Sequence, residues 1–370
     1  MICPHFEICG GCQIQDDYPI ALQKKVTTFK KLFGFSPDAI FESKERGFRA
    51  RAEFRIHRDG EKIFLSMNTF GKNERIPIDN CPNLLPILQE IIKKLPNLLQ
   101  EDILNHKLYA INLLGNINNK AILTLIYHKT LDSLWEQEAT KLAKMLKISI
   151  IGRSKNQEIV IGSNFINTEI PLDNTTLKYI YKEGNFSQPN PYINAKMINF
   201  VSQAIATHQK QDLLEMYCGS GNFTIALAKY FHKVFATEVV KSAIPILKEN
   251  AKNNHIANIY SARLSGEETI EALNFKRDFF RLKEIDLKTF NFSHILVDPP
   301  RSGIANKEVL EFIAKFPYII YISCNPQTLK EDSIFLGKTH KIIQSAIFDQ
   351  FPHTHHLETI FIFQKIFTES

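Results

Sequence analysis

One cysteine stands where a thiol could act as a nucleophile. Cys324 follows an apolar run at 318–322 that is typical of a buried strand, and Asn325-Pro326 ends that strand, because proline lacks a backbone donor and disfavours helix in the residue before it. Open α/β folds place their chemistry beyond the carboxyl ends of strands. The alternative is a buried packing residue, since free cysteine is among the most buried types. The motifs around it decide between the two.

A second stretch has the pattern of a nucleotide-type cofactor site. Residues 212–223 read as an apolar strand that runs into a Gly-Ser-Gly turn at 219–221 and then into an apolar helix. Glycines let the backbone approach a ligand closely, and a helix N-terminus offers free N–H donors. The next strand, 234–237, ends on Glu238, at the spacing where a carboxylate receives ribose hydroxyls. Because the third glycine of the dinucleotide fingerprint is missing, the pattern favours a single nucleoside, as in S-adenosylmethionine (SAM).

Two further acidic groups follow along the chain. A strand at 294–297 ends in an Asp-Pro-Pro-Arg stretch at 298–301, where the prolines fix a rigid loop and the acidic group faces the pocket of an α/β fold. Later, Glu358 follows three histidines at 353, 355 and 356. Their spacing is not the i, i+4 arrangement of helical zinc sites. We therefore interpret Glu358 as a general base rather than the histidines as metal ligands.

Six motifs occur in order along the C-terminal half: GNFSQPN (184–190), EMYCGSGNF (215–223), ATEVV (236–240), VDPPRSG (297–303), YISCNPQTL (321–329) and FDQFPHTHHLE (348–358). With them the chain resembles the RNA uracil-5-methyltransferases and, within these, the bacterial tRNA (uracil-5-)-methyltransferases. The resemblance covers about residues 17–366, and supporting stretches include RAEFRIHRDG (51–60). A motif order of this kind is highly specific.

The chemistry of that family explains the residue types. Uracil C5 is too weak a nucleophile to attack a sulfonium methyl directly, and a thiolate that adds to C6 makes an enolate that pushes electron density onto C5. A base must then remove the C5 proton so that the thiolate can leave. The resemblance implies Cys324 as the nucleophile and Glu358 as the proton acceptor, and we expect a lowered thiol pKa or local activation. It also implies SAM binding by Gln188, Tyr217, Asn222, Glu238 and Asp298.

Four cysteines lie outside this catalytic region. Cys3, Cys9 and Cys12 have the spacing C-x5-C-x2-C, and Cys81 supplies a distant fourth. Close thiols with glycines between them, in a chain without a secretory signal, indicate a metal or cluster site rather than disulfides. The set predicts a [4Fe–4S] cluster, with a structural zinc or free thiols as alternatives. The pattern is similar to that of the 23S rRNA uracil-5-methyltransferases, so rRNA stays an alternative substrate.

A basic strand is predicted in the N-terminal half. Residues 48–57 alternate with a period of two, so polar side chains share one face and apolar ones the other. Such a face would track phosphates, with a plain solvated face as the alternative. Because the target base must leave its stack, an aromatic wedge is also expected, with Phe186 and Phe351 as candidates. The residues on the polar face are Arg49, Arg51, Glu53, Arg55 and His57.

Length and composition are those of a two-domain globular protein. The chain has 370 residues, 44% of them hydrophobic, which is enough for substantial cores. We expect a cysteine-bearing segment and helix at 1–40, an α+β RNA-binding domain at 41–183, and an α/β class I SAM-dependent methyltransferase (Rossmann-like) domain at 184–370. The net charge of +6 is compatible with RNA binding. No apolar run approaches the roughly 20 residues of a membrane span, and no signal peptide is evident, so we expect a cytoplasmic protein.

Three functions are consistent with these features. The first, implied by the resemblance, is SAM-dependent methylation of uridine C5 at position 54 in the T-loop of tRNA, with the T-arm as partner, tmRNA as a further substrate and no obligate protein partner. The second keeps the reaction and changes the substrate to 23S rRNA. The third is an RNA-binding or RNA-folding protein in which methylation is secondary.

Overall fold

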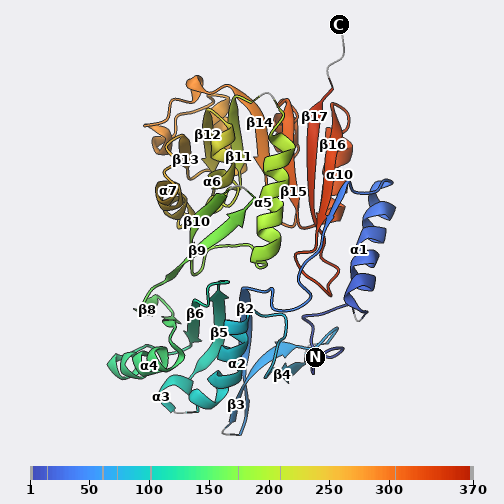
Figure 1. The fold of residues 1–370 in the computed structure, drawn as a ribbon. Helices are drawn as coiled ribbons and strands as arrows, with labels where there is room; N and C mark the ends of the chain where they lie inside the picture. Colours follow the sequence, from blue (N-terminus) through green and yellow to red (C-terminus); the bar gives the residue numbers. More distant parts are fainter. Residues whose placement is uncertain are drawn as a thin grey trace.

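The chain forms two layered regions in a computed structural model that describes residues 3–14, 16–60, 62–72, 74–100, 102–173, 175–208, 210–304 and 306–366 (Figure 1). The upper region in Figure 1 contains an eight-stranded sheet, and the lower region contains a seven-stranded sheet. A two-stranded sheet and the segment after it connect the two regions.

The eight-stranded sheet has the order β1-β16-β17-β15-β14-β11-β12-β13, and only β17 runs antiparallel to its neighbours. Its central strands are apolar throughout because both faces are covered; β11, for example, is buried at every position. Its strands are β1 (Ala39–Phe41), β11 (Asp212–Met216), β12 (Lys233–Thr237), β13 (Ile259–Ala262), β14 (Phe292–Val297), β15 (Tyr318–Ser323), β16 (His340–Phe348) and β17 (Glu358–Lys365).

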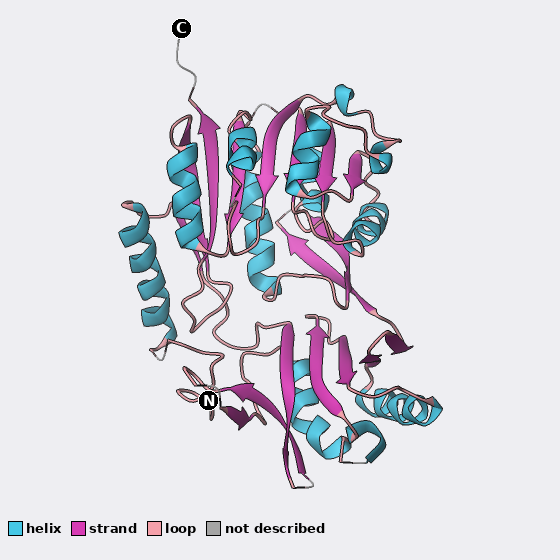
Figure 2. Cartoon of the chain, turned by 180° about the vertical axis from the view of Figure 1, so that it is seen from behind, coloured by secondary structure: helices cyan, strands magenta, loops and turns pink. Residues whose placement is uncertain are grey.

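Helices cover both faces of this sheet (Figure 2). Side chains of α1, α8, α9 and α10 contribute to one hydrophobic core, and those of α5, α6 and α7 contribute to the other. The helices are α1 (Tyr18–Phe33), α5 (Pro191–Ile205), α6 (Thr224–Leu227), α7 (Ala243–Asn253), α8 (Gly266–Leu273), α9 (Lys307–Ile313) and α10 (Pro326–Leu336). The helix predicted after the glycine turn is shorter than its apolar pattern suggested, because α6 gives way to a 3₁₀ turn at 228–230.

The lower region is an α+β unit with the strand order β4-β3-β2-β5-β6-β7-β8. Helices α2 and α4 pack on one face, around the fully buried Trp135. The alternation predicted for the basic strand is confirmed in β2, where Ala52, Phe54 and Ile56 are buried. The elements are β2 (Arg51–Asp59), β3 (Lys62–Asn68), β4 (Arg75–Pro77), α2 (Pro86–Leu98), α3 (Asp102–Asn105), β5 (Leu108–Gly115), β6 (Ala121–Tyr127), α4 (Ser133–Leu146), β7 (Ser149–Ser154) and β8 (Gln157–Ile161).

Packing does not follow the predicted boundaries at residues 40 and 183. Helix α1 and strand β1 join the eight-stranded sheet: Phe29 and Phe33 enter its core, and β1 pairs with β16. The hairpin of β9 (Phe165–Leu172) and β10 (Thr175–Lys182) rests on α5 and α7, where Asn250 Oδ1 accepts a bond from the backbone of Ile180 at 2.7 Å. Local patterns cannot show such attachments, because the partners lie far away in the sequence.

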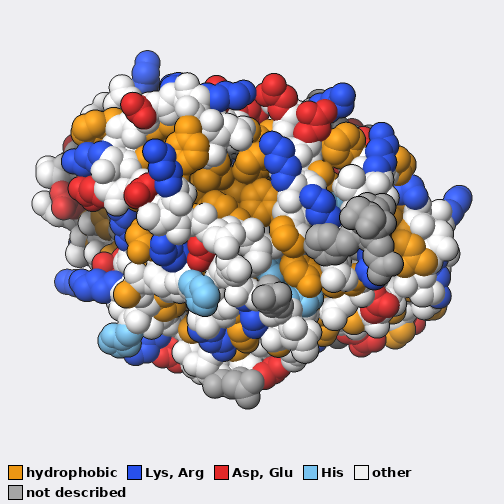
Figure 3. Space-filling view, turned by 90° about the horizontal axis from the view of Figure 1, so that it is seen from above, with side chains coloured by type: hydrophobic (Ala, Val, Ile, Leu, Met, Phe, Trp, Pro, Cys, Tyr) orange, Lys and Arg blue, Asp and Glu red, His pale blue; other side chains and the backbone are white. Residues whose placement is uncertain are grey.

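The parallel strands end toward the lower region. In Figure 1 the chain leaves β17 at the top, and β17 is antiparallel to β15 and β16. The face at the top of Figure 1, away from the edge where the parallel strands end, is seen from above in Figure 3. It carries a group of hydrophobic side chains bordered by Lys and Arg. None of the helices in the described ranges has the length and hydrophobicity needed to cross a membrane.

Candidate active site

Strand register brings the predicted acidic groups to one edge of the sheet. The last residue of β11 pairs with the last residues of both β12 and β14, so Tyr217 follows between Glu238 on one side and Asp298 on the other. The last residue of β15 pairs with the second residue of β17. Cys324 and Glu358 therefore lie side by side, although 33 residues separate them in the sequence. This is the edge where parallel α/β sheets bind ligands.

Burial raises the pKa of three groups at this edge, Asp298, Glu358 and Cys324. Burial raises the pKa of Asp298 to about 7, and burial together with Asp298 raises that of Glu358 to about 8, with Arg301 opposing. The thiol pKa of Cys324 rises to about 11 through burial, Glu358 and Asp298, again opposed by Arg301. The expected lowering of this pKa is therefore wrong, because burial of the thiol and the neighbouring acids outweigh the one guanidinium, while local activation stays a prediction. Arg301, to which the sequence analysis gave no role, favours the Cys324 thiolate and the Glu358 carboxylate.

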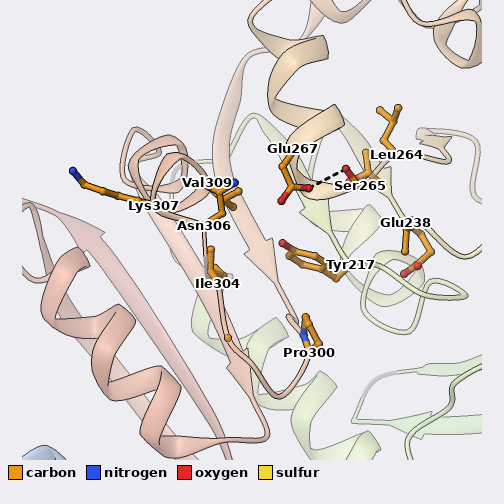
Figure 4. Close-up of a pocket in the computed structure, with 14 residues that line it drawn as sticks. Tyr217, Glu238, Leu264, Ser265, Glu267, Pro300, Ile304, Asn306, Lys307 and Val309 are labelled. Carbon is orange, nitrogen blue, oxygen red and sulfur yellow. Dashed lines mark hydrogen bonds between the residues drawn. The ribbon is translucent and has the colours of Figure 1, made fainter.

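Two cavities lie at this edge of the sheet, beside Tyr217, Glu238 and Asp298. The larger, about 610 Å³, is lined by Tyr217 and Glu238 together with Ser265 and Asn306 (Figure 4). In Figure 4 Tyr217 and Glu267 point toward one another across the cavity, and Glu267 accepts a bond from Ser265 Oγ at 3.0 Å. The smaller cavity, about 40 Å³, is lined by Gln188, Asn222, Asp298 and others. Because Tyr217 lines both, the two cavities form neighbouring parts of one site.

The glycine turn leads from β11 into α6, and it is bonded to the residue that follows β12. Gly219 and Gly221 have φ of 55° and 87°, a conformation that glycine adopts without strain. The N–H of Gly219 donates to Glu238 Oε2 at 2.9 Å, and the N–H of Val240 donates to Oε1 at 2.8 Å. These bonds fix the carboxylate at the end of β12, and each oxygen keeps a lone pair for a ligand hydroxyl.

Two of the predicted cofactor residues are held by amide partners. Asn222 exchanges two bonds of 2.8 Å with Asn194 of α5, so its side chain is engaged within the protein. Gln188 Oε1 accepts a bond from Gln350 Nε2 at 2.6 Å, and both side chains are buried. The structure thus brings Gln188 and Asn222 to the smaller cavity and gives each a fixed orientation.

Glu215 is a candidate residue that the sequence reading did not assign. It lies within β11, lines the smaller cavity and is 1% exposed. Burial raises its pKa to about 8, with Thr224 opposing and Asp298 adding to the shift. Its Oε2 has no hydrogen-bonding partner of good geometry in the described part of the chain. An acidic residue within the apolar stretch LLEM (213–216) was the signal that could have found it.

The predicted RNA-binding residues occupy different environments. Arg51 Nη1 donates to the carbonyl of Asn185 at 2.7 Å. Its guanidinium therefore binds β2 of the lower region to the segment that leads into α5. The guanidinium of Arg49 lies 5.8 Å from the ring of Phe351. Phe186 is 68% exposed beside the smaller cavity.

The outer face of the lower sheet carries a second group, which includes two unassigned residues. Arg55 is exposed, and its guanidinium lies 4.3 Å from the ring of Tyr109 on β5. Tyr109 in turn contacts His128, with ring centroids 4.4 Å apart. The cross-strand pair of His57 and Phe64 continues this face. A sheet face with exposed aromatic and basic side chains suits the stacking of unpaired RNA bases.

The four N-terminal cysteines line one cavity of about 90 Å³, and all have free thiols. Burial and then Cys81 raise the pKa of Cys12 to about 11, and burial likewise raises the pKa of Cys9 and of Cys81. Within the described ranges, no three His, Cys, Asp or Glu side chains are placed closely enough to hold a metal ion as they stand. The cluster and zinc interpretations therefore stay predictions.

The fold and site define a class of protein. An open sheet in which antiparallel β17 lies between β15 and β16, with a glycine turn and an acidic strand end beside a cavity, is that of a class I SAM-dependent methyltransferase. The family described as tRNA (Uracil-5-)-methyltransferase matches residues 17–366. The chain belongs to this family, and its activity is SAM-dependent methylation of C5 of uracil in RNA.

Relatives agree over nearly the full length. The tRNA/tmRNA (uracil-C(5))-methyltransferase of Helicobacter hepaticus is 46% identical, with 99% of each chain covered. The protein of the same name from Nitratiruptor sp. is 44% identical and covers 97% of this chain and 98% of its own. The structure of Pyrococcus abyssi tRNA (uracil-54, C5)-methyltransferase in complex with S-adenosyl-L-homocysteine has a TM-score of 0.72 at 22% identity, with 94% of this chain and 83% of that chain covered, and so shares the fold.

Proposed function

We propose that this enzyme methylates uridine 54 in the T-loop of tRNA, and the corresponding uridine of tmRNA, in the cytoplasm. The observation that carries the proposal is the meeting of Cys324, Glu358 and Asp298 at one sheet edge beside the cofactor cavity. The curated relatives at 46% and 44% identity bear the tRNA/tmRNA name, which favours tRNA over the 23S rRNA alternative.

Cys324 is the proposed nucleophile, and its thiolate adds to uracil C6. SAM supplies the electrophilic methyl group. Glu358 then accepts the C5 proton, and the electrons of that C–H bond re-form the C5–C6 double bond as the sulfur leaves. Arg301 opposes the rise in the pKa of both Cys324 and Glu358 and so favours the thiolate and the carboxylate that the two steps need.

The proposed cofactor residues fit the chemistry of SAM. Glu238, fixed by two backbone bonds, suits ribose hydroxyls in the larger cavity. Glu215 and Asp298 place buried acids around the smaller cavity, together with Gln188 and Tyr217. The unpartnered oxygen of Glu215 fits the α-ammonium of the methionine part, because a buried carboxylate needs a cationic partner.

The proposed RNA interface joins two surfaces. The outer face of the lower sheet, with Arg55, Tyr109 and His128, would receive bases and phosphates of the T-arm. Phe186 is exposed beside the smaller cavity. It would contact the uridine that leaves its base stack, together with Arg49. Arg51 would mainly keep the two regions in register.

We also infer that the four N-terminal cysteines hold a [4Fe–4S] cluster, with zinc as the alternative. Four thiols without histidine around one cavity are the donor set that both groups accept. The cluster would stabilise residues 3–12 against the lower sheet and would take no part in methyl transfer. Protein purified without oxygen should be brown, and colourless protein without bound metal would leave the cysteines as free thiols.

The experiment that tests the proposed substrate is transfer of a radiolabelled methyl group from SAM into unmodified tRNA, tmRNA and 23S rRNA, followed by mapping of the labelled uridine. We expect label at the T-loop uridine of tRNA and at its tmRNA counterpart. Label confined to 23S rRNA would mean that rRNA is the substrate, as the resemblance of the cysteine pattern to the 23S rRNA enzymes suggested. RNA binding without any label would favour an RNA-folding protein.

A further inference from the structure

A buried ion pair connects the N-terminal helix to the loop that precedes Glu358. Lys25 of α1 and Asp349 are 324 residues apart, yet Lys25 Nζ donates to Asp349 Oδ1 at 2.6 Å. The two side chains are 2% and 1% exposed. Lys25 Nζ also donates to the carbonyl oxygen of Phe351 at 2.8 Å. Because a buried charge is tolerated only when it is paired and hydrogen-bonded, this lysine holds residues 349–351 firmly.

The two acceptors of Lys25 lie on either side of Gln350. The side chain of Gln350 is 1% exposed and donates to Gln188 Oε1 at 2.6 Å. Gln188 lines the smaller cavity. A continuous set of buried contacts therefore runs from α1 through Lys25 and Gln350 to the cofactor site.

The rest of the loop is held independently of Lys25. The carbonyl oxygen of His353 accepts bonds from the backbone of Gln13 and Ile14 at 2.8 and 2.9 Å. Glu358 is fixed by its pairing with Phe348 at the start of the β16–β17 hairpin. Residues 349–351 also keep a backbone bond from Asp349 to the carbonyl of Phe41 at 3.0 Å. Loss of Lys25 should therefore loosen this segment and leave the proposed general base in place.

We propose that Lys25 is a positioning residue for methyl transfer: by fixing residues 349–351 it sets, through Gln350, the side-chain amide of Gln188 at the cofactor cavity. The inference rests on the proposed role of Gln188 in SAM binding. Lys25 itself lines neither of the two cofactor cavities in the described structure. Its contribution therefore acts through Gln350 rather than through contact with SAM.

The test compares Lys25→Met with Lys24→Met. Lys24 lies next to it on α1, but its ion pair with Asp16 is at the surface. For Lys25→Met we expect kcat/KM for SAM to fall by about 100-fold, the effect of a misplacement of about 1 Å. The KM for RNA and the covalent adduct between Cys324 and RNA should persist. Lys24→Met should match the wild type.

A double variant separates positioning from stability. Lys25→Met leaves the Asp349 carboxylate buried without its cationic partner, with the Tyr18 side chain still bonded to it, and Lys25→Met/Asp349→Leu removes that carboxylate. We expect the double variant to regain the wild-type Tm while kcat/KM for SAM stays low. The Phe351 carbonyl then keeps the local bonds from Thr354, at 2.8 and 3.3 Å, but loses its tie to α1. Recovery of kcat/KM together with Tm would overturn the proposal and leave Lys25 a structural residue.

Hydrogen exchange of the 349–357 peptide tests the same idea without turnover. Exchange should be faster in Lys25→Met and in the double variant, and unchanged in Lys24→Met. Unchanged exchange in Lys25→Met would mean that Lys25 does not fix the loop. If the wild type made no 5-methyluridine, the proposed function would fail, and exchange would still decide whether Lys25 holds residues 349–351.

Discussion

Replacement of Glu215 by glutamine should change protein stability and cofactor binding in opposite directions. The carboxyl group is buried in β11 with a pKa of about 8, raised from 4.5 mainly by burial. Between these two values the folded state keeps the proton that the unfolded state has lost, so stability falls as pH rises. Glu215→Gln keeps the shape of the side chain and removes the titration.

The size of the effect follows from linkage. One group in this window costs about 1.4 kcal/mol of unfolding free energy per pH unit. From about pH 5.5 to about pH 7.5, Glu215 alone should remove on the order of 2.5 kcal/mol from the wild type. Asp298 and Glu358, with pKa values raised to about 7 and about 8, add their own slopes. Glu215→Gln should therefore remove one of these three contributions to the pH dependence of the unfolding free energy.

Cofactor binding should move the other way. If Glu215 accepts the α-ammonium of SAM, its loss removes a hydrogen bond to a charged group, which is worth about 1.5–3 kcal/mol, or a roughly 10- to 100-fold weaker Kd. Urea unfolding at the two pH values and calorimetric titration with S-adenosylhomocysteine measure both effects. Glu284→Gln, at a side chain that is 85% exposed, is the control and should change neither.

The reasoning is refuted if Glu215→Gln retains the wild-type pH slope, because the carboxylate would then be ionised in the folded protein. It is also refuted for binding if the Kd for S-adenosylhomocysteine stays at the wild-type value. A variant that is less stable at every pH would show that Glu215 is needed for packing alone.

Three further predictions concern the reaction and the RNA. Cys324→Ala should abolish both methylation, measured by transfer of labelled methyl, and the covalent RNA adduct, measured on a denaturing gel, with an unchanged Tm. Residual methyl transfer would show that Cys324 is not the nucleophile. Glu358→Gln should still form the adduct but release product slowly. In the wild type, product release should slow as pH falls below about 8, because the raised pKa leaves Glu358 protonated there. A rate of release that does not change with pH would assign proton removal to another group. Tyr109→Ala should weaken RNA binding by about 1–3 kcal/mol, the value of a lost base stack, without a change in the Kd for SAM, and equal RNA affinity would place the T-arm elsewhere.

Much of the site could be predicted because its signals are local. An apolar run followed by Asn-Pro indicates a strand end at Cys324, and an acidic residue after a strand indicates the position of Glu238. Strand pairing then places such ends at one edge, as the register of β11, β12 and β14 shows. The alternation in β2 likewise needs only neighbouring residues.

Other features depend on partners that are distant in the sequence. The thiol pKa of Cys324 rises rather than falls, because the thiol is itself buried and because Glu358 and Asp298 lie close to it. Tyr109 and His128 join Arg55 only once β5 and β6 pair beside β2.

The sequence by itself determined the family, the reaction class and the strand ends that carry the chemistry, because motif order and hydrophobic periodicity are properties of neighbouring residues. Only the tertiary structure decided which groups share a buried environment. Lys25 reads as one more basic residue on a helix, and its pairing with Asp349 follows from the docking of α1 on the eight-stranded sheet. Burial and charge pairing are sums over long-range contacts, and these fix the electrostatics of the active site.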